Sequence, residues 1–387
     1  MKKIAVVVQR YGLEVNGGAE LYARQIAEKL KDKYYIEVIT TCAIDYVTWK
    51  NEYMEGYEYI NGILVRRFKV DKQRNNKRFN ELCSRIIPSP EKNTKKDEEE
   101  WMIEQGPTSS KLIEFLKGNH EQYDRIMFMT YLYYTTYFGL QIAPEKSILV
   151  SMAHDEPPIY LNIFKEIFHL PKYIFYLTDE EMKFVNKKFN NSYIDSEVLG
   201  VGIDIPQGIS AERFRTKYNI TEKFILYIGR IDESKGCREL FEYFRRYKNS
   251  VSNNIKLVLM GKEVIDVPKD DNIISLGFVT DEDKFDGINA CELLVNPSKF
   301  ESLSMVVLES MKLGKPVLVN GECEVLKGHC IKSNAGLYYE NYCEFEESIN
   351  FFINNTIVYN GMKSNCKKYI EERYSWDKVT KKLYKVI

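Results

Sequence analysis

Short apolar runs alternate with amphipathic segments along the whole chain, and this pattern limits the fold more than any other feature. Such runs, bounded by turn residues, are typical of strands in a parallel sheet covered by helices. In the first half of the chain they are Ile4–Val8, Ile36–Cys42, Ile63–Val70, Arg125–Thr130, Ser147–Met152 and Tyr173–Thr178. In the second half they are Phe224–Gly229, Lys256–Gly261, Ile273–Gly277, Leu293–Pro297, Pro316–Asn320 and Gly336–Tyr339. The sequence therefore predicts an α/β protein with two doubly wound sheets.

The length of the chain also indicates two domains, because 387 residues exceed what one hydrophobic core usually organises. The helical patterns between the runs include Gly18–Lys31, Arg238–Lys248 and Met305–Lys312. The polar stretch Gly200–Glu222 separates the two series of strands and is interpreted as their connection. Residues 71–105 interrupt the alternation with a dense run of charges, which is typical of a mobile surface element. A functional loop is the alternative, because long loops in compact domains often carry function.

Composition excludes several classes of protein. Hydrophobic residues make up 44% of the chain, charged residues 29%, and the net charge is -1, so a globular protein is expected and nucleic-acid binding is not. No apolar run is long enough to span a membrane, and the first strand lacks the continuation of a signal peptide. The eight cysteines, even Cys323, Cys330 and Cys343 with His329, match no common zinc spacing. We therefore expect reduced cytosolic thiols.

Two polar motifs follow predicted strands in the first half. Gly17 and Gly18 come after the first strand and open a helix, which lets a ligand approach the backbone closely. Their spacing is not the glycine fingerprint of dinucleotide-binding proteins, so an NAD-dependent oxidoreductase is unsupported. His154 lies at the carboxyl end of a strand, where open α/β sheets bind ligands. A structural histidine is the alternative.

Two further motifs follow strands in the second half. Gly229 leads into a loop with Arg230 and Lys235, whose planar guanidinium and compact ammonium suit a diphosphate. Solvated surface charges are the alternative for both residues. Val279 also follows a strand, and its backbone is placed to meet a nucleobase.

Glu301 and Glu309 lie eight positions apart, the first in a loop after a strand and the second in the next helix. Eight helical positions correspond to about 12 Å along the axis, on nearly the same face. The N-terminus of a helix between them is a ready anion site. Carboxylates on either side of a phosphate site suggest hydroxyl acceptors, one for each sugar of a nucleotide-sugar. Solvated positions on a helix surface are the alternative.

The ordered set of motifs resembles glycosyltransferase family 4. The residues that carry the resemblance are Gly17-Gly18, His154-Asp155, Gly229-Arg230, Lys235-Gly236, Pro297-Ser298, Glu301 and Glu309. The resemblance covers essentially the whole chain and implies the GT-B fold, in which two Rossmann-like doubly wound domains face each other across a deep cleft. It also implies a C-terminal helix that crosses back to the first domain, expected within Asn365–Ile387. We therefore expect an N-terminal acceptor-binding domain of residues 1–204 with 370–387, and a C-terminal nucleotide-sugar-binding domain of residues 205–369.

The resemblance implies a role for each motif. His154 would face the donor sugar, Arg230 and Lys235 would hold the diphosphate, and Glu301 and Glu309 would accept hydroxyls of the donor sugar and the ribose. The expected catalytic residues are His154, Glu301, Arg230 and Lys235. The expected donor-binding residues are Gly17, Gly18, Gly229, Arg230, Lys235, Val279, Glu301, Ser302, Leu303, Ser304 and Glu309. Leu303 and Ser304 would contribute backbone N–H groups.

The chain departs from the family pattern at two places. Ser302 and Ser304 stand where the family commonly has glycine, which makes the donor sugar harder to infer. The connection Leu199–Asp204 matches the usual Asn-Gly-Val-Asp only loosely.

The resemblance implies a retaining, metal-independent hexosyltransferase that uses a nucleotide-sugar donor as substrate and needs no cofactor. UDP is favoured over GDP, and the acceptor is expected to be a glycan, glycolipid or glycoconjugate in bacterial surface polysaccharide assembly. We expect a cytoplasmic protein. The basic stretch 66–78 is interpreted either as a contact with the anionic inner face of the cell membrane or as a solvated loop.

Two alternatives stay open on the sequence alone. One is an inactive GT-B subunit that binds a glycan or a partner. The other is a GT-B nucleotide-sugar epimerase, which would consume its nucleotide-sugar without an acceptor.

Overall fold

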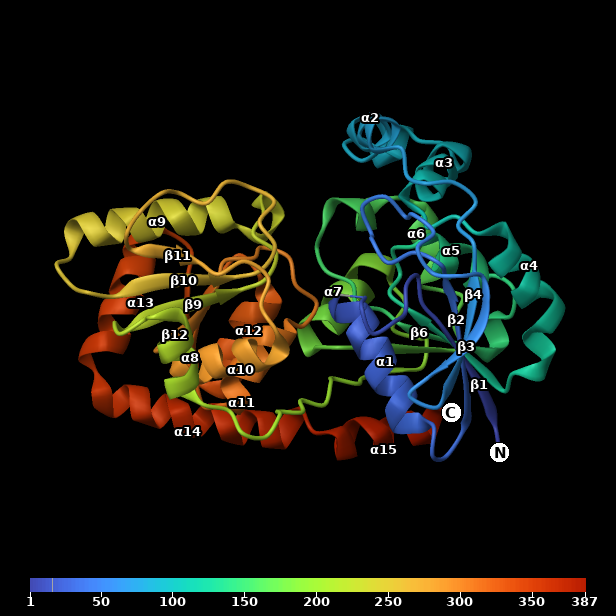
Figure 1. The fold of residues 1–387 in the computed structure, drawn as a ribbon. Helices are drawn as coiled ribbons and strands as arrows, with labels where there is room; N and C mark the ends of the chain where they lie inside the picture. The colour runs from blue at the N-terminus through green and yellow to red at the C-terminus, as the bar shows by residue number, and fades with distance from the viewer. Residues whose placement is uncertain (16) are drawn as a thin grey trace. The chain divides into compact units, whose positions relative to one another are not determined.

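The computed structural model describes residues 1–15 and 17–387, which form two compact units (Figure 1). Unit 1 comprises Met1–Gly200 with Val379–Ile387, and unit 2 comprises Val201–Lys378. Each unit has one sheet with helices packed on it, so the predicted fold of two doubly wound α/β domains is confirmed.

The sheet of unit 1 has the strand order β3-β4-β2-β1-β5-β6-β7-β8, and every neighbouring pair is parallel except β3 and β4. The strands are β1 (Lys3–Val7), β2 (Tyr35–Thr41), β3 (Gly56–Ile60), β4 (Ile63–Phe68), β5 (Arg125–Met129), β6 (Ser147–Val150), β7 (Tyr173–Tyr176) and β8 (Ser196–Val198). The strand order reverses between β1 and β5, which is the topological switch point of this sheet.

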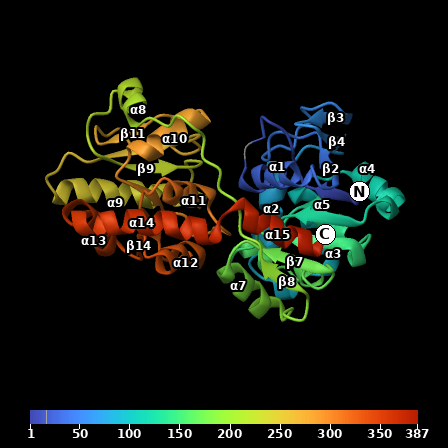
Figure 2. The ribbon, with the colours of Figure 1, turned by 90° about the horizontal axis from the view of Figure 1, so that it is seen from below.

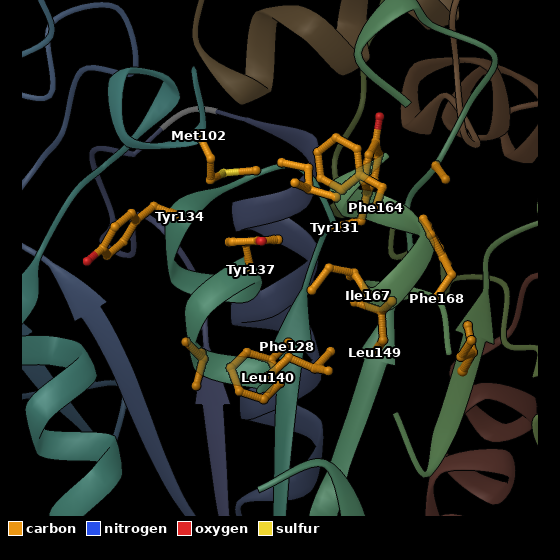
Figure 3. Packing of buried hydrophobic residues seen from close by; sticks show 14 of the residues in the cluster. Met102, Phe128, Tyr131, Tyr134, Tyr137, Leu140, Leu149, Phe164, Ile167 and Phe168 are labelled. Carbon is orange, nitrogen blue, oxygen red and sulfur yellow. The ribbon is translucent and has the colours of Figure 1, made fainter. Parts of the chain in front are cut away.

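The helices of unit 1 bury their apolar faces on the sheet or on one another. They are α1 (Gly18–Leu30), α2 (Asn76–Ile86), α3 (Lys95–Gln105), α4 (Ser110–Asn119), α5 (Tyr134–Leu140), α6 (Ile163–Ile167), α7 (Asp179–Phe189) and α15 (Trp376–Val386). Single 3₁₀ turns lie at η1 (Pro90–Lys92), η2 (His120–Gln122), η3 (Pro144–Lys146) and η4 (Pro157–Tyr160). Figure 3 shows Phe128 and Leu149 of the sheet within one core cluster with Leu140 of α5 and Ile167 of α6.

The charged segment 71–105 is part of this core, so its interpretation as a mobile surface element is corrected. Its helices α2 and α3 pack together, and the Trp101 side chain is only 1% exposed. The Trp101 ring meets Phe164 edge-on, with 6.5 Å between ring centroids. Glu98, fully buried, accepts the backbone N–H of Ile163 at 2.8 Å. The acidic residues around Trp101 conceal these core positions in the sequence.

The sheet of unit 2 is parallel throughout, with the order β11-β10-β9-β12-β13-β14. The strands are β9 (Phe224–Ile228), β10 (Lys256–Met260), β11 (Ile273–Ser275), β12 (Leu293–Asn296), β13 (Val317–Asn320) and β14 (Gly336–Tyr339). Its helices are α8 (Ala211–Tyr218), the 3₁₀ turn η5 (Glu233–Lys235), α9 (Cys237–Ser250), α10 (Asp281–Ala290), α11 (Met305–Lys312), α12 (Glu324–Ser333), α13 (Tyr342–Asn354) and α14 (Thr356–Arg373). The order reverses between β9 and β12, which is the switch point of unit 2.

The C-terminal end of the chain returns to unit 1, as the resemblance implied. Figure 2 shows α14 followed by α15, whose residues from Val379 onward belong to unit 1. There Lys2 Nζ donates to the Ile387 carbonyl at 2.6 Å, and Lys382 donates to the carbonyl of Val198. Within residues 1–15 and 17–387, every helix is too short or too polar to cross a bilayer.

Both segments that connect the units are fixed within unit 2. The backbone N–H of Ile203 donates to the Tyr374 carbonyl at 3.2 Å. Gly202 lies against the indole of Trp376, where a Cβ atom would come within 2.3 Å of the ring. Only glycine fits at that contact.

Candidate functional site

The residues expected to bind the donor diphosphate flank the switch point of unit 2. Arg230 and Lys235 follow β9, and Glu301 follows β12, the strand that pairs with β9. Loops at the carboxyl ends of strands on either side of a switch point form the usual ligand crevice of open α/β sheets. The fold therefore brings these residues to one place from positions far apart in the sequence.

A tight turn holds the loop that follows β9. Asp232 Oδ1 accepts the backbone N–H of Lys235 at 2.9 Å and the hydroxyl of Ser234 at 2.8 Å. The Asp232 carboxylate also pairs with the guanidinium of Arg230. Gly236 has a left-handed backbone (φ 73°), and a Cβ there would come within 2.4 Å of the Pro297 carbonyl. Glycine thus lets the loops after β9 and β12 touch.

Lys235 and Glu301 form an ion pair across this contact, with 2.8 Å between Nζ and Oε1. Burial opposes the charge of the ammonium, but the Glu301 carboxylate outweighs it and raises the pKa of Lys235. The Lys235 side chain keeps 32% of its surface exposed and Glu301 keeps 17%. A charged ammonium and a carboxylate are therefore both available to a ligand.

The turn 301–304 brings backbone donors to the same edge. Ser304 has a left-handed backbone (φ 69°), which is uncommon for a residue other than glycine and marks local strain. Its hydroxyl accepts the side-chain amide of Asn296 at 2.9 Å. Within residues 1–15 and 17–387, the N–H groups of Leu303 and Ser304 have no hydrogen-bond acceptor. They precede the first turn of α11, where the helix dipole favours an anion.

Glu309 lies in the second turn of α11 and is 5% exposed. Its Oε1 pairs with Lys284 Nζ at 3.0 Å, whereas Oε2 is buried and has no hydrogen-bond partner among the described residues. Burial raises the pKa of Glu309, and Lys284 opposes that shift. A buried acceptor without a donor is costly, so a ligand hydroxyl would be favourable there.

The remaining donor residue, Val279, lies in the loop after β11, at the outer edge of the sheet. Two positions earlier, Gly277 has a left-handed backbone (φ 65°), and its carbonyl accepts the N–H of Gly261 at 2.7 Å. The neighbouring Phe278 ring is 71% exposed. Two open hollows of about 390 and 640 Å³ lie elsewhere, beside α9 and β14. They do not include the residues at the switch point.

In unit 1, Gly17 and Gly18 follow β1 at the switch point of its sheet. A Cβ on Gly17 would come within 2.1 Å of Glu20 Oε2, so a larger residue would displace this carboxylate. Glu20 is buried and accepts Gln9 Nε2 and Arg10 Nε, both at 2.8 Å. Sequence reasoning missed this network. The only signal was an acidic residue in the first turn of the helix that the glycines open.

His154 follows β6, two strands from β1 in the sheet. Its Nδ1 lies 3.1 Å from Glu156 Oε1, which also accepts the hydroxyl of Tyr131 at 2.8 Å. The imidazole thus lies beside a carboxylate and remains 25% exposed. Partial exposure suits a group that faces a substrate.

A second buried carboxylate fixes the backbone before His154. Glu181 accepts the N–H of Ala153 at 2.7 Å and that of Leu177 at 2.6 Å. Burial raises the pKa of Glu181 to about 7, against the effect of these two hydrogen bonds. Thr178 and Glu181 have the spacing of a capping box, a signal that could have identified this residue in the sequence.

Asp281 and Asp283 have the Asp-x-Asp spacing of metal-dependent glycosyltransferases, which the sequence interpretation overlooked. They lie in the first turn of α10, where Asp283 accepts Lys217 Nζ at 2.7 Å and the Thr280 hydroxyl at 2.8 Å. Asp283 therefore forms part of a helix cap and a salt bridge. Across residues 1–15 and 17–387, no three His, Cys, Asp or Glu side chains are grouped as a metal site. All eight cysteines are free thiols.

The basic stretch 66–78 is largely paired within unit 1. Arg66 contacts Glu37 at 2.8 Å, and Arg67 is buried beside Glu58 at 2.7 Å. The remaining pairs are Lys72 with Glu104, Arg78 with Glu100 and Glu104, and Arg74 with the Gln105 carbonyl.

Residues 209–373 match the family model described as "Glycosyl transferases group 1". An uncharacterized glycosyltransferase of Methanocaldococcus jannaschii is 27% identical over 177 residues, which are 43% of this chain and 44% of that relative. The match thus spans less than half of the relative's own length. The family model and the relative both support a glycosyltransferase.

Solved structures resemble the chain over its full length. Sucrose-phosphate synthase from Thermosynechococcus elongatus has a TM-score of 0.74 at 15% identity, with 100% of this chain and 98% of that chain covered. Anabaena HepE in complex with UDP-glucose has a TM-score of 0.70 at 14% identity, with 100% and 99% covered. WaaG, a glycosyltransferase involved in lipopolysaccharide biosynthesis, has a TM-score of 0.66 at 15% identity, with 98% of each chain covered. The chain therefore has the GT-B fold.

Proposed function

We propose that this protein is a retaining, metal-independent glycosyltransferase that moves a hexose-type sugar from a nucleoside diphosphate sugar to a glycan, glycolipid or glycoconjugate. The observation that carries the proposal is the arrangement at the switch point of unit 2. There the Lys235–Glu301 pair, 2.8 Å between Nζ and Oε1, lies at the contact between the loops after β9 and β12. The N–H groups of Leu303 and Ser304 follow Glu301 in the second of these loops and have no acceptor in the described part of the chain.

Each group has a chemical role in this reaction. Cleavage of the anomeric C–O bond leaves negative charge on the diphosphate while the sugar becomes oxocarbenium-like. We propose that this charge develops beside Arg230, Lys235 and the backbone donors, because such preorganised donors usually supply the largest part of catalysis. Glu301 would accept hydroxyls of the donor sugar. His154 of unit 1 would contact the sugar near the reacting carbon.

Retention would follow if the acceptor hydroxyl attacked from the face that the diphosphate leaves. The acceptor proton would then pass to a phosphate oxygen of the leaving group, which needs no further protein base. We propose that the cationic side chains stabilise this diphosphate without a metal ion. Transfer should therefore continue in excess EDTA, and the product should have the anomeric configuration of the donor by NMR.

UDP is the favoured donor nucleotide, with GDP as the alternative. The similarity to HepE, whose structure is a complex with UDP-glucose, supports this choice. The unbonded Oε2 of Glu309 offers an acceptor for ribose hydroxyls in either nucleotide. Calorimetry with UDP and GDP distinguishes them, and screening their hexose conjugates for hydrolysis identifies the donor.

The similarity to WaaG, a glycosyltransferase involved in lipopolysaccharide biosynthesis, supports a role in surface polysaccharide assembly. We propose that this assembly takes place in the bacterial cytoplasm, next to the membrane. The basic stretch 66–78 provides less free charge for a membrane contact than its sequence indicated, because most of its cations are already paired. The test is co-sedimentation with vesicles containing phosphatidylserine at low salt, where each free cation near the surface contributes about 1 kcal/mol. Binding that is unchanged by Lys69→Glu and Lys77→Glu would contradict a contact through this stretch.

Variants at the ion pair test the activity. Lys235→Ala and Glu301→Ala should each lower the rate of transfer by roughly 10²-fold or more while the protein stays folded. Lys327→Ala is the matched control, because it removes another 2.8 Å Lys–Glu pair of unit 2, with Glu340, on α12. Near wild-type rates in both site variants would refute the site.

The same assay separates the two alternatives. An epimerase would turn over its nucleotide-sugar with no acceptor present, whereas a transferase requires one. An inactive binding subunit would show neither turnover nor nucleotide affinity.

A further inference from the structure

His329 of α12 is fully buried in unit 2, and both nitrogens of its ring are hydrogen-bonded. Nε2 lies 2.8 Å from the carbonyl oxygen of Leu303, and Nδ1 lies 2.9 Å from the hydroxyl of Tyr369. A carbonyl oxygen can only accept a hydrogen bond, so Nε2 carries the proton. Nδ1 then accepts the Tyr369 hydroxyl, which fixes one tautomer.

The environment keeps this imidazole neutral. Burial lowers the pKa of His329 to about 4, and the positive charge of Lys332 adds to that effect. Near neutral pH the ring therefore acts as a fixed dipole with one donor and one acceptor. It is held between the 301–304 turn and α14.

The hydrogen bond from His329 to the Leu303 carbonyl also sets the direction in which the backbone N–H of Ser304 points. The carbonyl of Leu303 and the N–H of Ser304 belong to one peptide unit, and in a trans peptide these two groups point in opposite directions. Because His329 holds the carbonyl toward the interior, the Ser304 N–H points the other way. This N–H has no acceptor among the described residues, and it belongs to the strained residue with φ 69°.

The histidine is itself held from the other side. The Tyr369 hydroxyl lies 3.4 Å from that of Tyr374, at the end of α14. The Tyr374 carbonyl accepts the N–H of Ile203, in one of the segments that connect the units. A rigid support behind a strained turn is what a preorganised anion site needs.

We propose that His329 is a positioning residue for the donor diphosphate: its neutral Nε2–H holds the Leu303 carbonyl so that the Ser304 N–H faces the phosphate oxygens. This inference rests on the proposed function and adds a residue of α12 that does not touch the substrate. It also explains the left-handed backbone of Ser304, because another backbone conformation would turn the Ser304 N–H away from the phosphate oxygens.

The test compares ligands with and without phosphate. Calorimetry measures the affinity of the full chain and its variants for UDP, inorganic pyrophosphate and uridine. His329→Leu removes both ring hydrogen bonds and should weaken UDP and pyrophosphate about tenfold or more, which is the effect of a hydrogen bond to a charged group. Uridine affinity should stay within about twofold, because only the phosphate loses its donor.

A conservative variant separates positioning from packing. In His329→Gln the side-chain amide offers an N–H donor and an oxygen acceptor, so UDP affinity should return to within about threefold of wild type. Tyr247→Phe is the matched control, because this buried tyrosine of α9 accepts Asn253 Nδ2 at 2.6 Å away from the turn. It should leave all three affinities unchanged.

Several results would overturn the inference. One is a folded His329→Leu protein with wild-type affinity for UDP and pyrophosphate, and another is equal loss for UDP and uridine. If His329→Leu does not fold, Tyr369→Phe decides: it removes the hydroxyl that fixes the tautomer and should weaken UDP and pyrophosphate several-fold but not uridine. Wild-type affinities of Tyr369→Phe for UDP and pyrophosphate would then refute the positioning role of His329. A wild-type protein that binds neither UDP, GDP nor pyrophosphate would instead refute the proposed function, and the inference with it.

Discussion

The two switch points of this protein differ in where their charged groups lie. At the edge of unit 2, cations and carboxylates lie together, and the N–H groups of Leu303 and Ser304 have no acceptor among the residues that the structure describes. At the edge of unit 1, the glycines and His154 face outward, while the carboxylates that support them, Glu20 and Glu181, are buried beneath. Unit 2 thus keeps charged side chains partly exposed at its switch point, whereas unit 1 uses buried charge to shape its own loops.

This difference explains which half of the chain is easier to interpret. Residues 209–373, which match the family model, lie within unit 2. Every nucleoside diphosphate donor carries the same charged diphosphate group, so the residues that bind this group are expected to vary little. An acceptor differs from enzyme to enzyme, and the loops of unit 1 would differ with it.

The largest effect should come from removing a charge that faces the ligand. Lys235→Ala should lower kcat by roughly 10²–10³-fold, or about 3–4 kcal/mol, because a donor to the developing negative charge is lost. Single-turnover kinetics with saturating donor measure this effect. A reduction of less than tenfold would show that unit 2 does not bind the diphosphate through this edge.

In unit 1 the corresponding test is one of stability. The pKa of Glu181 is raised to about 7, above its ordinary value of 4.5, so the folded state holds more protons than the unfolded state between these pH values. The stability of unit 1 should therefore fall as pH rises from 4.5 to 7, by about 3 kcal/mol from this group. Hydrogen exchange of the β6 and β7 amides measures this loss. Glu181→Gln should flatten the dependence, and an equal slope in the variant would contradict the assignment.

Glu309→Gln should weaken UDP binding by about 2 kcal/mol, roughly 30-fold, because a buried charged acceptor is lost. The sharper measurement repeats the titration with 2′,3′-dideoxyuridine diphosphate, which lacks the ribose hydroxyls. The variant and the wild type should then differ little, since the two changes remove the same interaction. If the losses of binding free energy from Glu309→Gln and from removal of the ribose hydroxyls added up, the Glu309 carboxylate would not contact the ribose.

The smallest effect is expected at Ser304. Ser304→Gly relieves the left-handed backbone but loses the bond from Asn296, so stability should change by less than about 1 kcal/mol. Ser304→Ala keeps the strain and loses the bond, and should be less stable than the glycine variant. Thermal unfolding compares the two. The opposite order would mean that the turn is not strained.

Most of the fold could be predicted from the sequence, because the buried strands are short apolar runs. The hairpin partner β3 was missed because its residues are exposed and form no buried apolar run, although Asn61-Gly62 gives the usual signal of a two-residue turn. Strand β8 has three residues, too few for a pattern. The helices α2 and α3 were concealed by their charge.

The local part of the candidate site could also be predicted, because Arg230, Lys235, Glu301 and Glu309 lie in short motifs after strands. The residues that support them could not. Lys284 is 25 positions from its partner Glu309, and His329 is 26 positions from Leu303, so neither pairing leaves a local pattern. Such contacts depend on the tertiary fold.

The return of the chain to unit 1 has a consequence for its biosynthesis. The carbonyl of Val198 and the side chain of Lys2 receive partners from the C-terminal segment only after Val201–Lys378 has been made. At translation speeds of about 5–20 residues per second, that delay is roughly 10–40 s. The sequence of unit 2 is therefore complete before that of unit 1. Until Val379–Ile387 is made, the surface of unit 1 that this segment covers stays exposed and could bind a chaperone.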